Sequence, residues 1–203
     1  MYARVASFES RDPSLADELV STIRDRSARS REELPGARGA LMLVDREGNT
    51  SLGITFFESR EAIDEATPVF EKMGDDFPEE LRGRRASVDA YEVVVARGSG
   101  EGANAARVSV LEGSADRLDE SLEEILPQLQ RVEGFKGVLG LADPERNRMK
   151  TVTLWESSEA LRASEEQANQ LRQRAAEGAS ARIVDVKRFE VAYAELGQLA
   201  TVS

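Results

Sequence analysis

The chain has 203 residues, of which 40% are hydrophobic and 32% charged, a balance typical of folded globular proteins rather than of disordered or fibrous ones. Its formal charge of −11 argues against a nucleic-acid partner, because phosphate binding needs an excess of clustered Lys and Arg. Cysteine and histidine are both absent, which excludes disulfides, thiolate nucleophiles and the commonest metal ligand. We expect no metal or other cofactor.

No apolar run approaches the length of a membrane span, so no membrane partner is expected. The N-terminus passes directly into strand-like sequence and lacks the charged and apolar regions of a secretory signal. These features predict a cytoplasmic protein.

Alternation and helical periodicity in the first half predict the order strand, helix, strand, strand, helix, strand. Asp12, followed by a proline, supplies an N-cap for a helix that runs to Glu33. Ser59 caps the second helix, which we expect to be short or broken, because Pro68 cannot donate a backbone hydrogen bond and Gly74 follows it. The strands are predicted at 2–8, 40–44, 52–57 and 84–95.

The second half predicts the same order after a Gly/Ser-rich linker. Ser114 is expected to cap a helix with an apolar stripe through Leu129, which Pro127 bends or ends. Ser157 should cap an uninterrupted helix to about Glu177. The strands are predicted at 107–111, 138–142, 149–155 and 183–193. We divide the chain into a first domain at 1–97, a linker at 98–105 and a second domain at 106–203.

The two halves repeat one another. The nine-residue segments 55–63 and 153–161 share five identities, where unrelated segments would match at about one position. The offset of 98 also pairs Gly36 with Gly134 (134 − 36 = 98), whereas Ala3 pairs with Ala106 at an offset of 103 (106 − 3 = 103). About five extra residues therefore lie in the first half before Gly36. The repeat predicts two tandem domains of α+β class, each a ferredoxin-like βαββαβ unit.

The third strands of the two halves predict how the sheets are covered. One face is aliphatic or aromatic, with Leu52, Ile54, Phe56, Val152 and Leu154. The other is mixed, with Thr55, Phe57, Thr151, Thr153 and Trp155. We assign the first face to the helices and the mixed face to the space between the sheets. Because an open apolar sheet face would associate, we expect the two sheets to pack face to face as an intrachain dimeric α+β barrel. The sequence leaves further pairing of whole chains open.

The segment Thr-Leu-Trp-Glu-Ser-Ser-Glu-Ala-Leu at 153–161 resembles the antibiotic biosynthesis monooxygenase (ABM) domains of the dimeric α+β barrel superfamily, as do Leu34-Pro35-Gly36 and Glu133-Gly134-Phe135 at the openings of the second strands. Members usually pair as homodimers, so the resemblance implies a pair built within one chain. It implies cofactor-free oxygenation of anthrones or quinols, or haem breakdown. The haem-degrading branch needs a histidine on the second helix and an asparagine on the first strand. This chain lacks both, so haem degradation is disfavoured.

An aromatic position at the end of the third strand is one candidate for a pocket. Trp155 matches the tryptophan of the quinol-forming branch, and it could line a site for a planar aromatic or simply fill the core. Phe57 replaces it in the first half, and Thr153 lies on the same mixed face.

Two arginines and a tyrosine are further candidates. Arg4 and Arg107 occupy equivalent positions on the two first strands, where they could bind an anionic oxygen or form ion pairs with carboxylates. Tyr91 could donate its phenol to a substrate or to a buried backbone group. No residue is identified as catalytic.

The sequence leaves several functions open. One is a cofactor-independent monooxygenase that takes a small, planar, quinol- or anthrone-like aromatic, which reacts with oxygen as its own carbanion. The alternatives are a non-catalytic small-molecule binding or stress-related module, and a purely structural pseudo-dimer. An open barrel lined by Trp155 would favour the enzyme, and a closed aliphatic barrel would argue against it. We expect any single pocket on the Trp155 side, because the second half keeps the tryptophan and an uninterrupted helix.

Overall fold

The computed structural model describes residues 1–197, apart from the side chains of residues 28–32. In the first half the elements are β1 (Tyr2–Glu9), the 3-10 helix η1 (Pro13–Leu15), α1 (Ala16–Glu33), β2 (Ala37–Asp45), β3 (Thr50–Phe57), α2 (Arg60–Asp75) and β4 (Arg84–Arg97). In the second half they are β5 (Ala105–Gly113), α3 (Leu118–Leu129), β6 (Phe135–Asp143), β7 (Arg148–Trp155), α4 (Ser158–Ala163), α5 (Glu165–Gly178) and β8 (Ala181–Glu195).

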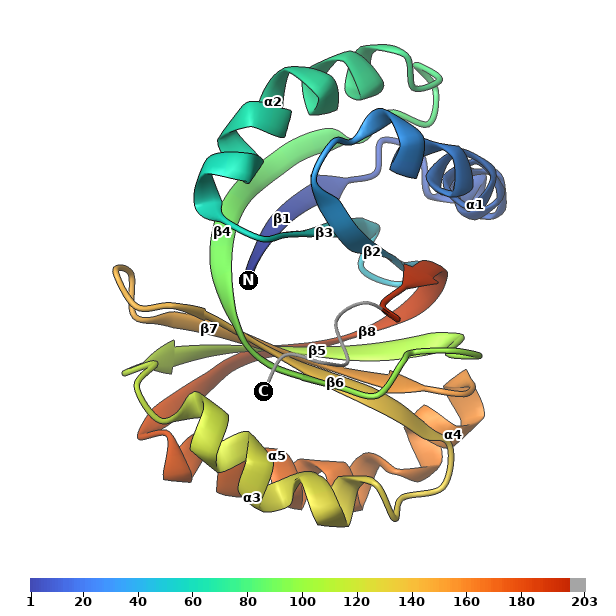
Figure 1. Ribbon diagram of the computed structural model, residues 1–203. Helices are drawn as coiled ribbons and strands as arrows, with labels where there is room; N and C mark the ends of the chain where they lie inside the picture. The colour runs from blue at the N-terminus through green and yellow to red at the C-terminus, as the bar shows by residue number, and fades with distance from the viewer. Residues whose placement is uncertain (198–203) are drawn as a thin grey trace.

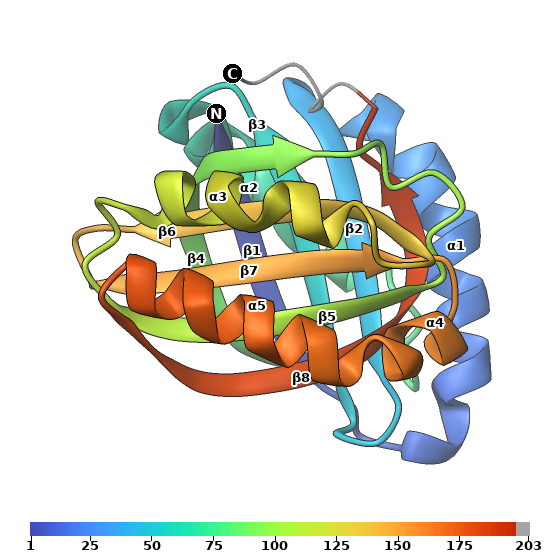
Figure 2. The same ribbon diagram turned by 90° about the horizontal axis from the view of Figure 1, so that it is seen from below.

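The strands form one closed antiparallel barrel in the order β1-β3-β2-β8-β5-β7-β6-β4. Each half contributes four neighbouring strands, and the halves are joined by the pairs β2–β8 and β4–β6. Figure 1 shows α1 and α2 outside the first-half strands and α3, α4 and α5 outside the second-half strands, on the opposite side of the barrel. Figure 2 shows the same barrel from below. The predicted α+β class and the order of elements are confirmed. No helix within residues 1–197 is long and apolar enough to cross a membrane.

The barrel interior is filled by side chains from both halves. The largest apolar cluster includes the third-strand residues Ile54 and Phe56 together with Val152 and Leu154. Our assignment of the two sheet faces was therefore wrong: this apolar face points into the barrel, and the mixed face meets the helices. The physical reason is that a closed barrel shields its interior from water on every side, so polar groups there would find few partners. The helix face supplies backbone and side-chain partners for Arg107, and Trp155 donates a hydrogen bond to Thr153 on the same face.

The helices after the third strands reverse our expectation. α2 is continuous through Pro68, whereas the equivalent second-half helix breaks at Ser164 into α4 and α5. Pro68 is tolerated because it and Asp64, whose carbonyl loses its helical donor, are exposed to water. The break at Ser164 has a side-chain cause, since both Ser164 Oγ and Arg107 Nη2 donate to the carbonyl oxygen of Leu161. That oxygen would otherwise accept the next helical hydrogen bond.

Residues close in sequence determine where the helices after the third strands begin. Ser59 and Ser157 accept hydrogen bonds from the backbone three residues on, as predicted for N-caps. Ser114 is not the cap of α3, because its hydroxyl bonds Asp116 and the cap position falls on Arg117. Gly134 has a positive φ of 77°, and a Cβ there would lie 2.5 Å from the Cβ of Ala160, so the turn before β6 requires glycine.

Candidate ligand-binding site

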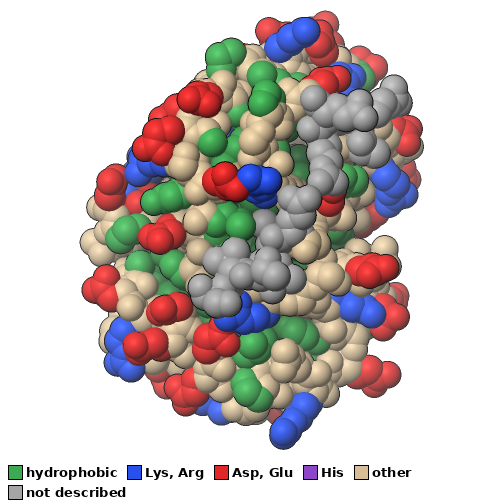
Figure 3. All heavy atoms as spheres, in the orientation of Figure 1, with side chains coloured by type: hydrophobic (Ala, Val, Ile, Leu, Met, Phe, Trp, Pro, Cys, Tyr) green, Lys and Arg blue, Asp and Glu red, His purple; other side chains and the backbone are tan. Residues whose placement is uncertain are grey.

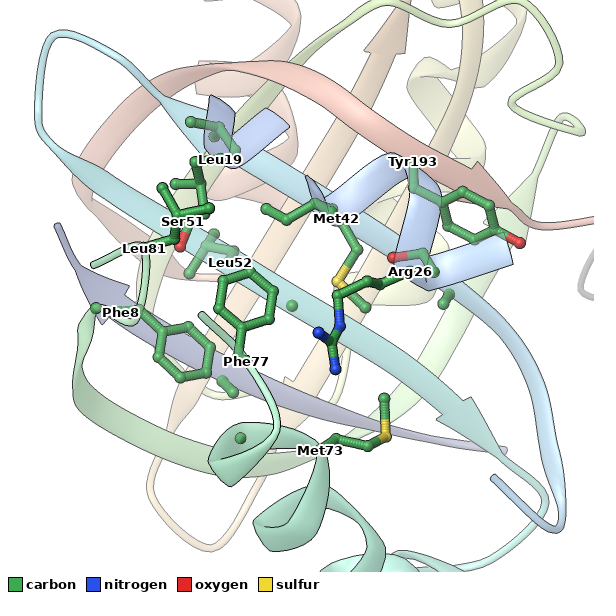
Figure 4. Close-up of a pocket in the computed structure, with 18 of the residues that line it drawn as sticks. Phe8, Leu19, Arg26, Met42, Ser51, Leu52, Met73, Phe77, Leu81 and Tyr193 are labelled. Atoms are coloured by element: carbon green, nitrogen blue, oxygen red, sulfur yellow. The ribbon is translucent and has the colours of Figure 1, made fainter. Parts of the chain in front are cut away.

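A cavity of about 520 Å³ lies in the first half, between the outer face of the sheet and the helices α1 and α2. This volume is in the range of small-molecule sites. Its wall is mainly apolar, and Figure 4 shows Phe8, Leu81 and Phe77 gathered on one side with Met42 and Met73 nearby. The cavity can therefore hold a small molecule with a largely apolar body.

The equivalent place in the second half is closed. It contains a space of only about 30 Å³, with room for about one water molecule. In Figure 1, α3 and α5 run side by side, and they pack closely on one another, whereas α1 and α2 are far less in contact. At the offset of 98, Arg172 of α5 occupies the position of Gly74 in α2, and both line their cavities. The second-half counterpart of the cavity is thus filled by the side chains of its own helices.

Arg4 is a charged residue buried beside the open cavity, which Asp45 also lines. It sits on β1 opposite Thr55, is 7% exposed, and lines the cavity. Its guanidinium carbon lies 3.9 Å from the centroid of the Phe70 ring, a cation–π contact. Among the residues that the structure describes, none hydrogen-bonds or ion-pairs with Arg4.

Burial lowers the pKa of Arg4 to about 10, helped by the positive charge of Arg85 and opposed by Glu71. A group with this pKa remains protonated at neutral pH. Arg85 and Glu71 form an ion pair of 2.7 Å with each other. Arg4 is therefore left as a cation that faces the cavity.

Arg107, its counterpart on β5, is held by the protein. It is 2% exposed, and its Nη2 donates to the Leu161 carbonyl at 2.8 Å and to Glu165 Oε2 at 3.0 Å. Glu165 Oε2 also accepts a hydrogen bond from Arg188 Nε at 3.2 Å. Within the described residues, Arg107 Nε and Nη1 have no hydrogen-bond partner. The structure thus favours the ion-pair interpretation for Arg107 and the anion-binding interpretation for Arg4.

Glu165 is expected to stabilise the fold only above its acidic range. Burial tends to raise the pKa of Glu165, but Arg188 and Arg107 outweigh it and hold the pKa below its usual value. Its contribution is therefore present above the unfolded pKa of about 4.3 and is lost as the pH falls through the lower folded value. Glu165→Gln should lower the free energy of unfolding by about 1–2 kcal/mol at neutral pH. The check is urea unfolding across pH.

The control for this experiment is Glu166→Gln, at the exposed neighbouring position. The difference between wild type and Glu165→Gln should shrink below about pH 4. A difference that is constant from neutral to acidic pH would contradict the ion-pair role.

Trp155 does not line either cavity. It is fully buried, its Nε1 donates to Thr153 Oγ1 at 3.0 Å, and its ring meets the ring of Phe135 edge-on at 5.7 Å. It packs with Leu161 and Ala168 of the helices, as a core aromatic. The expectation that the pocket lies on the Trp155 side was wrong, because the side chains of α4 and α5 fill that side.

The remaining candidates are placed in different environments. Phe57 is fully buried and packs against Phe70 at 6.2 Å, outside the lining of the cavity. Thr153 borders the small second-half space. Tyr91 lies in the barrel interior, where burial and nearby carboxylates raise its pKa to about 12. Of the six predicted residues, the structure brings only Arg4 to the large cavity.

Sequence reasoning missed two groups of cavity residues. One is the inner face of α1, where Leu19 and Arg26 point toward the cavity in Figure 4. Their helical spacing from Ile23 is the signal that could have found them. The other is Tyr193 of β8, which the pairing of β8 with β2 brings beside Met42. Tyr193 belongs to the second half, so only the tertiary structure places it here.

No family model matches the chain. The uncharacterized protein Rv2558 of Mycobacterium tuberculosis H37Rv is 26% identical over 208 residues, which cover 97% of this chain and 85% of that protein. The uncharacterized protein Rv2557 of the same strain is 23% identical over 206 residues, covering 97% and 89%.

Solved structures share the fold. An anthrone oxidase-like protein has a TM-score of 0.63 at 14% identity, covering 100% of this chain and 96% of its own. A monooxygenase-like protein of Listeria innocua has a TM-score of 0.52 at 9% identity, covering 93% of each chain. A ferredoxin-fold protein of Listeria monocytogenes, related to antibiotic biosynthesis monooxygenases, has a TM-score of 0.51 at 9% identity, covering 93% and 94%. The resemblance to ABM-related proteins is thereby confirmed at the level of the fold.

Proposed function

We propose that this chain, which has the fold of the ABM-related ferredoxin-fold proteins, binds a small, planar, mainly apolar aromatic molecule in the first-half cavity. The observation that carries the proposal is the cavity of about 520 Å³ with the buried Arg4 in its wall, a cation that has no ion-pair or hydrogen-bond partner in the described part of the chain. Aromatic and thioether side chains favour a flat apolar body. Arg4 and the Tyr193 phenol, which donates to Glu195 at 2.9 Å, supply polar groups.

The two halves are proposed to act as an intrachain counterpart of a dimeric α+β barrel, with their sheets face to face. The shared apolar cluster and the strand pairs β2–β8 and β4–β6 support this arrangement. We keep the domain limits 1–97 and 106–203, with the linker at 98–105. A cytoplasmic location and the absence of nucleic-acid and membrane partners also remain part of the proposal. In Figure 3, acidic side chains are spread over the visible face among basic ones. This distribution supports the absence of a nucleic-acid partner.

Cofactor-independent oxygenation is the second candidate function, and the anthrone oxidase-like neighbour favours it. The filled barrel interior removes the site that we first considered, so any reaction would take place in the helix-face cavity. An anthrone and O2 would give an anthraquinone and water, and Arg4 would stabilise the enolate oxygen of the reacting anion. Binding alone needs only the cavity and Arg4, so the geometry supports binding best.

The experiment is titration of the full chain with anthrone by calorimetry, followed by oxygen uptake measurements on the same complex. Saturable binding to wild type is expected, with at least about tenfold weaker binding to a cavity-filling Gly74→Arg variant. Arg182→Gln, on the exposed second-half surface, is the control and should bind as wild type does. Binding without oxygen uptake supports the binding module, and oxygen uptake that depends on the protein supports the monooxygenase. No saturable binding would contradict both.

A further inference from the structure

The duplication supplies two versions of one site, one closed and one open. In the closed version a carboxylate of the chain itself, Glu165, meets the buried guanidinium of Arg107 at 3.0 Å. Glu165 is held there by the first turn of α5, directly after the break at Ser164. The Ser164 hydroxyl lies 3.5 Å from the same Nη2. The second half therefore fills the anion position beside its arginine from within.

The open version has lost those partners. At the offset of 98, Ala66 stands in place of Ser164 and Thr67 in place of Glu165 (165 − 98 = 67). Thr67 Oγ1 donates instead to the carbonyl of Ile63, at 3.2 Å. That carbonyl is the counterpart of the Leu161 oxygen that accepts from Arg107 (161 − 98 = 63). In the first half α2 thus keeps its own hydrogen bonds and offers Arg4 neither the carbonyl nor a carboxylate.

The charged side chains around Arg4 do not neutralise it, so one anion can pair with it. Glu71, one turn beyond Thr67, is a carboxylate whose charge acts on Arg4, but it is 55% exposed and pairs with Arg85. These two charges cancel, so the charge of Arg4 remains. A buried guanidinium without a partner is costly, and a fork-shaped carboxylate is the ligand group that matches it best.

We propose that the natural ligand of the first-half cavity is a carboxylic acid, whose carboxylate pairs with Arg4 as Glu165 pairs with Arg107. Its apolar body lies among Phe8, Phe77 and Met42, in the part of the cavity that Figure 4 shows. This inference rests on the proposed binding function and narrows it to organic acids with an aromatic body. A neutral aromatic would fill the same space but leave Arg4 unpaired.

The test uses two probes with one body, 2-naphthoate and 2-naphthylmethanol, titrated into the full chain by calorimetry at neutral pH. Naphthoate should bind wild type about 10–100-fold more tightly than the alcohol, because one charged pair is worth this much. Arg4→Gln should remove the difference between the two probes, and Arg4→Lys should restore part of it. Equal affinities of both probes for wild type would overturn the inference while the binding function stands. Failure of both probes to bind would overturn the binding function as well.

Thr67→Glu tests the position of the carboxylate. The substitution places a carboxylate where the second copy has Glu165, so it should satisfy Arg4 from within and weaken naphthoate binding at least about tenfold. Thr67→Gln has the same shape without the charge and should bind naphthoate as wild type does. Since Thr67 is exposed, both variants should fold. Undiminished naphthoate binding by Thr67→Glu would contradict the proposed equivalence of the ligand carboxylate and Glu165.

Discussion

Trp155→Ala is expected to lower the free energy of unfolding by about 3–5 kcal/mol, the loss typical of a fully buried aromatic. The substitution leaves a cavity among Phe135, Leu161 and Ala168, and it removes the hydrogen bond to Thr153. The affinity for naphthoate should stay unchanged at temperatures where the variant is folded, because Trp155 lies in the second half and lines neither cavity. Urea unfolding and calorimetric titration measure the two effects.

Phe57→Ala is the matched variant in the first half, at the repeat position of Trp155 (155 − 98 = 57). It should be similarly destabilising, and it should also weaken naphthoate binding, because Phe57 supports the Phe70 ring that covers Arg4. An exposed apolar residue, Val184, supplies a control substitution to Ala with little effect on either quantity. Loss of naphthoate binding in a folded Trp155→Ala protein would return the ligand site to the second half.

The substitutions Arg4→Leu and Arg107→Leu are expected to change stability in opposite directions, although the two residues are repeat equivalents. Arg107→Leu breaks a buried ion pair and should lower the free energy of unfolding by about 2–4 kcal/mol, since Glu165 keeps Arg188 as a partner. Arg4→Leu removes an unpaired buried cation and should raise the free energy of unfolding by about 1–2 kcal/mol, after the loss of the contact with Phe70.

The measurement for the arginine pair is urea unfolding without ligand, repeated with saturating naphthoate. The ligand should stabilise wild type and Arg107→Leu through binding to the folded state, but not Arg4→Leu. A destabilised Arg4→Leu protein would show that Arg4 has a structural role like that of Arg107. That result would contradict the proposal that Arg4 binds a ligand and lowers the stability of the ligand-free protein.

The architecture was readable from the sequence because it depends on local patterns that occur twice. Alternation defined the strands, and the serines at 59 and 157 marked helix starts that the structure confirms. The repeat predicted two sets of four strands and two sets of helices, and both sets of strands form the closed barrel. Arg4 was also found from the sequence, since an arginine recurs at one position of both first strands, where apolar residues are commoner.

The location of the open site was decided only by the tertiary structure. Both faces of the third strands contain apolar residues, so alternation alone cannot tell which face enters the barrel and which meets the helices. Whether the cavity of each half is open or closed depends on contacts between residues far apart in sequence. Arg107 and Ser164 capture the Leu161 carbonyl and break the helix, which lets Glu165 reach the arginine. In the first half the Ile63 carbonyl accepts a hydrogen bond from Thr67 of the same helix, α2. Arg4 is therefore available to pair with a ligand.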